Sequence, residues 1–124
     1  MRRLRSESGA AAVEFALVVP ILLLVLFGIV EFGRVYNAQL QVTSAAREAV
    51  RVMAIQKDSD VAVAAAILSA PGLQPALSSG QVTVTPCESA TETTVTVTYS
   101  VDLLSGLFAD AVSVTGRGVM RCGG

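Results

Sequence analysis

Residues 9–37 read GAAAVEFALVVPILLLVLFGIVEFGRVYN, and this stretch decides how the rest of the chain can fold. It carries no charged residue between Phe15 and Val30. As an α-helix rising about 1.5 Å per residue, the segment from Ala10 to Val30 would span roughly 30 Å, the thickness of a bilayer core. The stretch therefore predicts a transmembrane helix.

Glu14 interrupts the apolar pattern near the start of this helix. A carboxylate in hydrocarbon is costly, and such residues usually have a function. Glu14 nevertheless lies only about one turn into the span, so a side chain that merely reaches back to the headgroups is the alternative interpretation. Glu31, at the other end, is interpreted as a marker of the outer membrane boundary.

The residues before the span are short, polar and basic, with arginines at positions 2, 3 and 5. A secretory signal begins in the same way, but a cleavage site with small residues should then follow its apolar core. Here the core runs into Glu31-Phe32-Gly33-Arg34, so an uncleaved membrane anchor is the stronger alternative. Basic residues before a span place the N-terminus in the cytoplasm and the rest of the chain outside.

The run from Gly9 to Phe15, GAAAVEF, resembles the processing site of type IV prepilins. In those proteins a membrane peptidase cuts after the glycine, and a glutamate stands at the fifth position of the mature chain. The longer stretch 9–37 is similar to TadE-family minor pilins (pseudopilins) of tight-adherence, or Flp, pilus systems. The spacing between Gly9 and Glu14 is a weak signal when taken alone. It becomes specific because it lies between a basic leader and a membrane helix.

The resemblance implies that a prepilin peptidase cuts between Gly9 and Ala10. Glu14, with Phe15 beside it, would then pair with the new N-terminal ammonium of a neighbouring subunit and fix the register between helices. The implied partners are the peptidase, other pilins or pseudopilins, the pilus assembly platform and membrane lipid. The implied location is the bacterial inner membrane or the pilus itself. Methylation of the new N-terminus is not implied, because major type IV pilins usually begin with Phe.

Beyond the span, apolar residues recur at intervals of three, four and seven and predict that the helix continues to about Gln56. They are Val35, Val42, Ala46, Ala49 and Met53. Asp58 or Ser59 can cap a second helix over residues 60–69, which Pro71 and Gly72 would end.

Three later segments alternate β-branched residues with polar ones, which predicts strands. They cover residues 81–86, 93–101 and 112–122, and their short connections favour an antiparallel meander. These elements predict an α+β fold with one sheet face covering the helix stripe, and the resemblance implies that this fold is of the type IV pilin kind. The apolar connection 103–108 is expected to pack on the core, with the membrane surface or another subunit as alternatives. The predicted organisation is a leader (1–9), a transmembrane helix (10–30), its extracytoplasmic continuation (31–56) and a head (57–124).

Cys87 follows the first predicted strand and Cys122 ends the third, and in a meander these two strand ends lie at the same edge of the sheet. We therefore expect a disulfide between Cys87 and Cys122, and free thiols are the alternative. An extracytoplasmic head is a compartment in which disulfides persist. The spacing does not fit a CxxC redox motif or a metal site.

The composition of the chain excludes several classes of function. The 124 residues are 52% apolar and 15% charged, with a net charge of −1 and no histidine. The net charge excludes the basic surface of a nucleic-acid-binding protein. Without histidine, no nucleophile–base pair is supported, so neither an enzyme nor a bound cofactor or metal is expected. The leading hypothesis is a minor pilin of an adhesive pilus or related secretion filament. An uncleaved single-pass protein that binds an envelope partner is the alternative, and an enzyme completed by another chain is a third.

Overall fold

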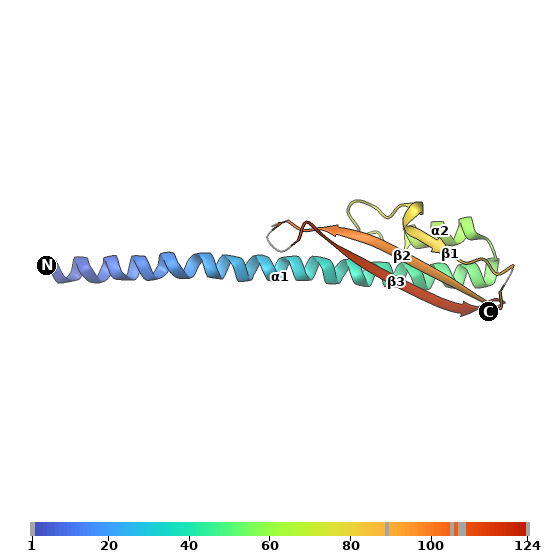
Figure 1. Cartoon of the computed structure of the whole chain (residues 1–124), viewed down its shortest axis with the longest axis horizontal. Helices are drawn as coiled ribbons and strands as arrows, with labels where there is room; N and C mark the ends of the chain where they lie inside the picture. The colour runs from blue at the N-terminus through green and yellow to red at the C-terminus, as the bar shows by residue number, and fades with distance from the viewer. Residues whose placement is uncertain (1, 89, 105, 107–108, 124) are drawn as a thin grey trace. The chain divides into compact units, whose positions relative to one another are not determined.

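The structure is a computed structural model that describes residues 2–88, 90–104, 106 and 109–123, with the backbone alone for residues 2–6. Its elements are α1 (Arg2–Gln56), α2 (Ser59–Leu68), the short 3-10 helix η1 (Ser79–Gln81), β1 (Val82–Val84), β2 (Glu92–Asp102) and β3 (Ala111–Arg121), shown in Figure 1. The predicted α+β class, with two helices and a three-stranded sheet, is confirmed. The chain forms two compact units, Met1–Gly33 and Arg34–Gly124.

Helix α1 is rich in alanine and leucine and continues through Pro20. It ends at Gln56, as predicted, because Lys57 adopts a left-handed conformation with φ 58°. The Lys57 N–H donates to the Met53 carbonyl at 2.9 Å and closes the last turn. A left-handed residue after the last turn is a common helix end, although glycine is the usual residue there.

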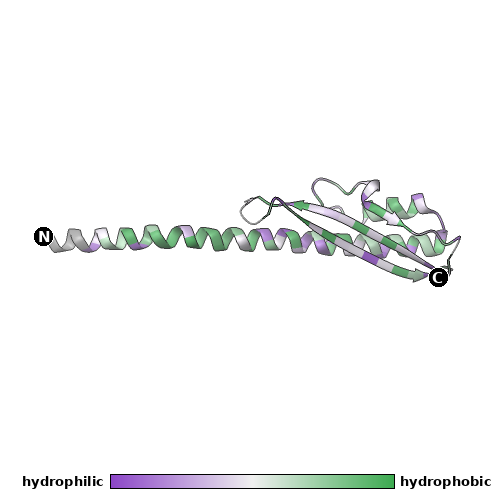
Figure 2. Cartoon of the chain, viewed as in Figure 1, coloured by the Kyte–Doolittle hydropathy of each residue, from purple (hydrophilic) through white to green (hydrophobic). Residues whose placement is uncertain are grey.

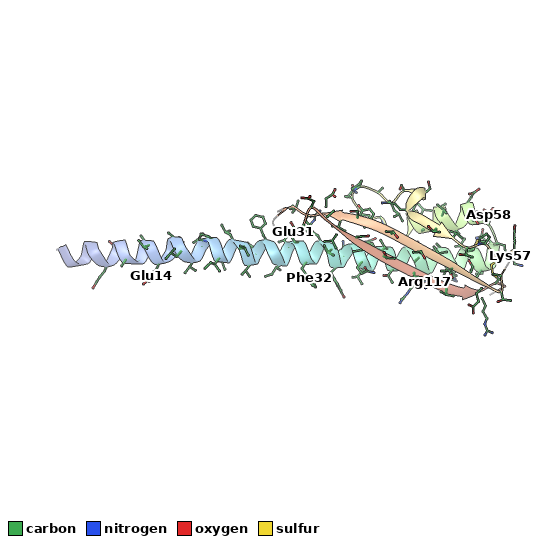
Figure 3. All side chains as sticks on the ribbon, in the orientation of Figure 1. Glu14, Glu31, Phe32, Lys57, Asp58 and Arg117 are labelled. Carbon is green, nitrogen blue, oxygen red and sulfur yellow. A yellow bond between two sulfur atoms is a disulfide. The ribbon has the colours of Figure 1, made fainter. Side chains whose placement is uncertain are left out.

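Of the two predicted caps for α2, Asp58 is the one used. Its side chain accepts hydrogen bonds from the backbone N–H groups of Asp60 (2.9 Å) and Val61 (3.2 Å). Lys57 and Asp58, labelled in Figure 3, are thus the two residues that turn the chain from one helix into the next.

The sheet has the order β1-β2-β3 with antiparallel neighbours, which confirms the predicted meander. Val97 at its centre pairs with Val82 on one side and Gly116 on the other. Alternate residues of β2 face inward and are at most 6% exposed, and they are Thr93, Val95, Val97, Tyr99 and Val101. The intervening residues are mainly threonines and line the outer face.

The core of the second unit lies between this inner face and the second half of α1. The predicted apolar stripe is confirmed, since Val35 is partly buried and the other four members are fully buried. The buried surface is wider than the stripe and consists largely of small side chains. It also includes Ala38, Ala45, Val50 and Ala54 from α1, and Ala62 and Ala66 from α2.

Two glycines bring β3 directly onto the backbone of α1. A methyl group added at Gly116 would overlap the carbonyl group of Val42, and one at Gly118 would lie 2.8 Å from the Ala46 carbonyl oxygen. Gln39 of α1 donates a side-chain hydrogen bond to the Thr115 carbonyl at 2.9 Å. The strand therefore approaches the helix more closely than any residue with a Cβ would permit.

The apolar connection after β2 is only partly described. Ser105, Leu107 and Phe108 lie outside the described residues, so the expected packing of this loop on the core stays a prediction. Leu104 is described and is 66% exposed.

Candidate functional site

The predicted processing and pairing residues lie near the start of α1, and every residue from 7 to 18 is exposed. Gly9 is helical, and nothing lies within 4 Å of the position that a Cβ would occupy there. Glu14 projects from the helix (Figure 3) and makes no hydrogen bond or ion pair with another described residue. Phe15, beside it, is 71% exposed.

Helical geometry relates Ala10 to Glu14. Residues four apart lie on the same face of an α-helix, one turn above each other, and side chains lean toward the helix N-terminus. The Glu14 side chain therefore leans toward the level of Ala10. A carboxylate in this position can approach an ammonium group at residue 10, on its own chain or on a parallel neighbour.

The segment that follows is apolar and uncovered. Helix α1 is long and apolar enough to cross a membrane, and none of the residues in its most apolar window are buried. Figure 2 shows the hydrophobic colour along this part of the helix. The exposed large side chains between the two glutamates include Leu17, Ile21, Leu24, Phe27 and Ile29. One long apolar N-terminal helix fits a single-pass membrane protein.

Glu31, interpreted from the sequence as a boundary marker, differs from Glu14 in its surroundings. It is 8% exposed, whereas Glu14 is exposed. Both carboxylates belong to the first compact unit, but their exposure differs. Of the two, Glu14 is therefore the one accessible to another chain.

In the second unit, the two cysteines are joined. The Cys87–Cys122 disulfide has a Cα–Cα distance of 5.7 Å and closes a sequence separation of 35. The Cys87 sulfur also lies 3.8 Å from the Met53 carbonyl, and the Gly123 N–H donates to the Ala54 carbonyl at 3.0 Å. The bridge thus joins the ends of β1 and β3 beside the last turn of α1.

A small cavity of about 120 Å³ lies between α1, β2 and the chain after α2. Arg34 and Tyr99 are two of the polar residues that line it. Arg34 donates through Nη1 to the Asp102 carbonyl at 3.0 Å, and the Tyr99 hydroxyl donates to the Pro75 carbonyl at 2.7 Å. Burial raises the pKa of the Tyr99 phenol above its ordinary value of 10.0, and the nearby Asp102 charge raises it further. Both side chains thus donate hydrogen bonds to backbone carbonyl groups of other segments, which is a structural role.

The described residues offer no group of three or more His, Cys, Asp and Glu side chains placed to hold a metal ion. Of the residues singled out from the sequence, the fold brings Cys87 and Cys122 together. Gly9, Ala10, Glu14 and Phe15 lie along one helix with no tertiary partner assigned to them. The glycines at 116 and 118 were missed, although a G-x-G pair within a β-branched alternation is a signal for close backbone approach.

Residues 9–51 match the family model of TadE-like proteins. This confirms the expected resemblance, and the matched region begins at Gly9. It covers the Gly9–Glu14 spacing, the apolar span and most of the second half of α1, and it stops before α2 and the sheet. The family indicates a pilin-like protein associated with the tight-adherence pilus, and such proteins are structural rather than enzymatic. No curated protein and no solved structure matches the chain.

Proposed function

We propose that this chain is a minor pilin that a prepilin peptidase processes between Gly9 and Ala10. The mature subunit takes part in assembling an adhesive tight-adherence pilus or a related secretion filament. The observation that carries the proposal is the family match over residues 9–51, which includes the Gly9–Glu14 spacing ahead of an uncovered apolar helix.

Exposure of the apolar segment supports a membrane-inserted subunit. Each large apolar side chain left in water forgoes roughly 1.5–3 kcal/mol of burial free energy. Leu17, Ile21 and Phe27 are each at least half exposed, as are most of their large apolar neighbours. Lipid before assembly, and neighbouring helices after it, would cover this surface.

Gly9 is well suited to be the residue before the cleaved bond. A peptidase must open the helix locally to reach the peptide bond, and glycine is among the poorest helix formers, by about 1 kcal/mol relative to alanine. The open space around Gly9 leaves the backbone accessible from the side of its missing Cβ.

Cleavage would create an ammonium group at Ala10 and so supply a partner for Glu14. A lone carboxylate in a low-dielectric setting tends to take up a proton, whereas a paired one stays charged. Pairing with the ammonium of a neighbouring subunit fixes how far one helix is shifted along the next. We therefore assign Glu14 to subunit register and Phe15 to the adjacent helix contact.

The N-terminal residue of the mature protein tests the processing step. On co-expression with a prepilin peptidase, N-terminal sequencing should give Ala10, and Gly9→Val should leave Met1 intact. Gly33→Val is the matched control, because a Cβ at Gly33 also meets nothing within 4 Å, and it should be cleaved normally. An intact Met1 in the unsubstituted chain would favour the uncleaved single-pass anchor.

Assembly is tested separately with Glu14→Gln. This variant should be processed normally but give fewer pili, because the neutral amide cannot pair with the ammonium. Glu7→Gln is the matched control, since residue 7 is removed with the leader. Normal piliation by Glu14→Gln would contradict the role assigned to Glu14.

A further inference from the structure

A shallow groove runs over the exposed face of the second half of α1. Two hollows of about 510 and 360 Å³ form it, and they share Leu40, Ser44 and Ser69. Its floor is α1, one wall is the end of α2 with Pro71, and the other is Met120 of β3. Figure 1 shows α2 and β3 on different sides of this part of α1.

The floor residues follow the spacing of a helix-packing seam. Exposed residues alternate at intervals of three and four along α1, and they are Asn37, Leu40, Ser44, Arg47 and Arg51. Residues at this spacing lie on one face, and a second helix packs along such a face in coiled coils and bundles. Leu40 is 53% exposed and supplies an apolar contact at one end.

The charge of the groove selects the kind of helix that fits. Arg47 and Arg51 lie one turn apart, and neither makes a hydrogen bond or ion pair with another residue that the structure describes. Glu48 is the one acidic residue among those lining the two hollows, and it is half-buried. Two guanidinium groups on successive turns therefore face solvent.

We propose that this groove binds an amphipathic helix from a different protein chain, with carboxylates on successive turns facing Arg47 and Arg51. Apolar side chains toward the two ends of the same helix contact Leu40 and Met120. The inference rests on the proposed function, since it takes this chain to be anchored in a membrane beside other pilin-like subunits.

A symmetric pair of copies of this chain does not satisfy the groove. Two copies inserted in the same membrane with the same orientation can form a closed pair only about an axis along the membrane normal. Such a pair would place Arg47 opposite Arg47 and Arg51 opposite Arg51, with like charges facing each other. Like-charge contacts of this kind are destabilising, so an unlike, acidic helix is favoured.

The test uses the full-length protein in detergent micelles and two synthetic helical peptides with the same apolar face. One peptide carries Glu at positions four residues apart, and the other carries Lys there. Fluorescence anisotropy should detect binding of the Glu peptide alone. Arg47→Glu with Arg51→Glu should weaken it about tenfold or more and create affinity for the Lys peptide.

Arg117→Glu with Arg121→Glu is the matched control, because these two exposed arginines lie in β3 on the outer face of the sheet. Arg117 is labelled in Figure 3. The control variant should bind the Glu peptide as the unsubstituted protein does. Equal loss in both double variants would mean unspecific attraction by net charge and would overturn the proposal.

Two further outcomes would overturn the assignment. One is failure of the Glu peptide to bind the unsubstituted protein. The other is a homodimer cross-linked by a bis-maleimide through Ser44→Cys, which would show that a second copy covers the groove. N-terminal sequencing of the chain co-expressed with a prepilin peptidase separates the two proposals, because an intact Met1 there refutes processing and leaves the peptide result unaffected.

Discussion

The two halves of α1 share one secondary structure and differ in what covers their side chains. In the first half, Phe15 is 71% exposed and most of the large apolar residues that follow are at least half exposed. In the second half, Val42, Ala46 and Ala49 are fully buried. The buried residues of the second half are mostly small, and the exposed apolar residues of the first half are mostly large.

This difference shows that hydrophobicity and burial are separate properties of a helix. The first half is more apolar, yet its large apolar side chains are exposed in the part of the chain that the structure describes. The second half is less apolar and is covered because its alanines and the glycines of β3 allow the sheet to lie against its backbone. Stability of the folded unit should therefore depend on the second half and be indifferent to the first.

The largest effect is expected from Gly116→Val. A side chain at this position would overlap the carbonyl group of Val42, which belongs to helical backbone and cannot move aside. We expect the sheet to lose its cooperative unfolding, or its free energy of unfolding to fall by more than about 4 kcal/mol. Near-UV circular dichroism of the buried Tyr99 during urea unfolding in micelles would measure this. Gly80→Ala is the control, because nothing lies within 4 Å of a Cβ there, and an equal loss in that variant would contradict the explanation.

The next effect is that of removing the disulfide. Replacing both Cys87 and Cys122 with Ser should lower the free energy of unfolding of the sheet unit by roughly 4 kcal/mol, because the bridge restricts the unfolded chain. The helicity of the apolar half of α1 should not change. Urea unfolding followed by near-UV and far-UV circular dichroism separates the two regions, and a loss of helicity in the span would contradict the expected independence.

A matched pair of valines tests the comparison itself. Val42→Ala should cost about 2 kcal/mol, because it leaves a cavity beneath the sheet. Val25→Ala makes the same chemical change in the same helix at a residue that is 52% exposed, and it should leave the unfolding midpoint unchanged. Equal effects of the two substitutions would mean that the apolar half also stabilises the sheet unit.

The smallest effect is expected at the cap of α2. Asp58→Ala removes the acceptor for the N–H groups of Asp60 and Val61 and should cost about 1 kcal/mol. Asp58→Asn keeps a side-chain oxygen and should remain within a few tenths of a kcal/mol of the unsubstituted protein. Thermal unfolding of both variants measures the difference. An Asn variant as unstable as the Ala variant would assign the effect to charge instead of capping.

Much of the fold could be predicted from local patterns. The end of α1 at Gln56, the second helix and the antiparallel order of three strands follow from apolar spacing, capping residues and β-branched alternation. The disulfide could be expected because a meander brings the ends of its first and third strands together. The residues of the candidate processing site are contiguous in the sequence, so their spacing could be read without any tertiary structure.

The features that were not predicted depend on contacts between distant segments. Gly116 and Gly118 signal a close backbone approach, but only the fold places Val42 and Ala46 beneath them. The groove along Leu40 and Arg47 exists only because α2 and β3 form its two walls. No local pattern specifies either arrangement, since each depends on how closely elements far apart in the chain approach one another.

For Glu14, the sequence by itself determined the position of the charge, five residues after Gly9 at the head of an apolar helix, because this spacing and the apolar run are properties of contiguous residues. The tertiary structure decided which part of α1 is buried, because burial depends on the space that glycine and alanine leave between packed elements. It left the Glu14 side chain exposed and buried one face of the second half of the same helix.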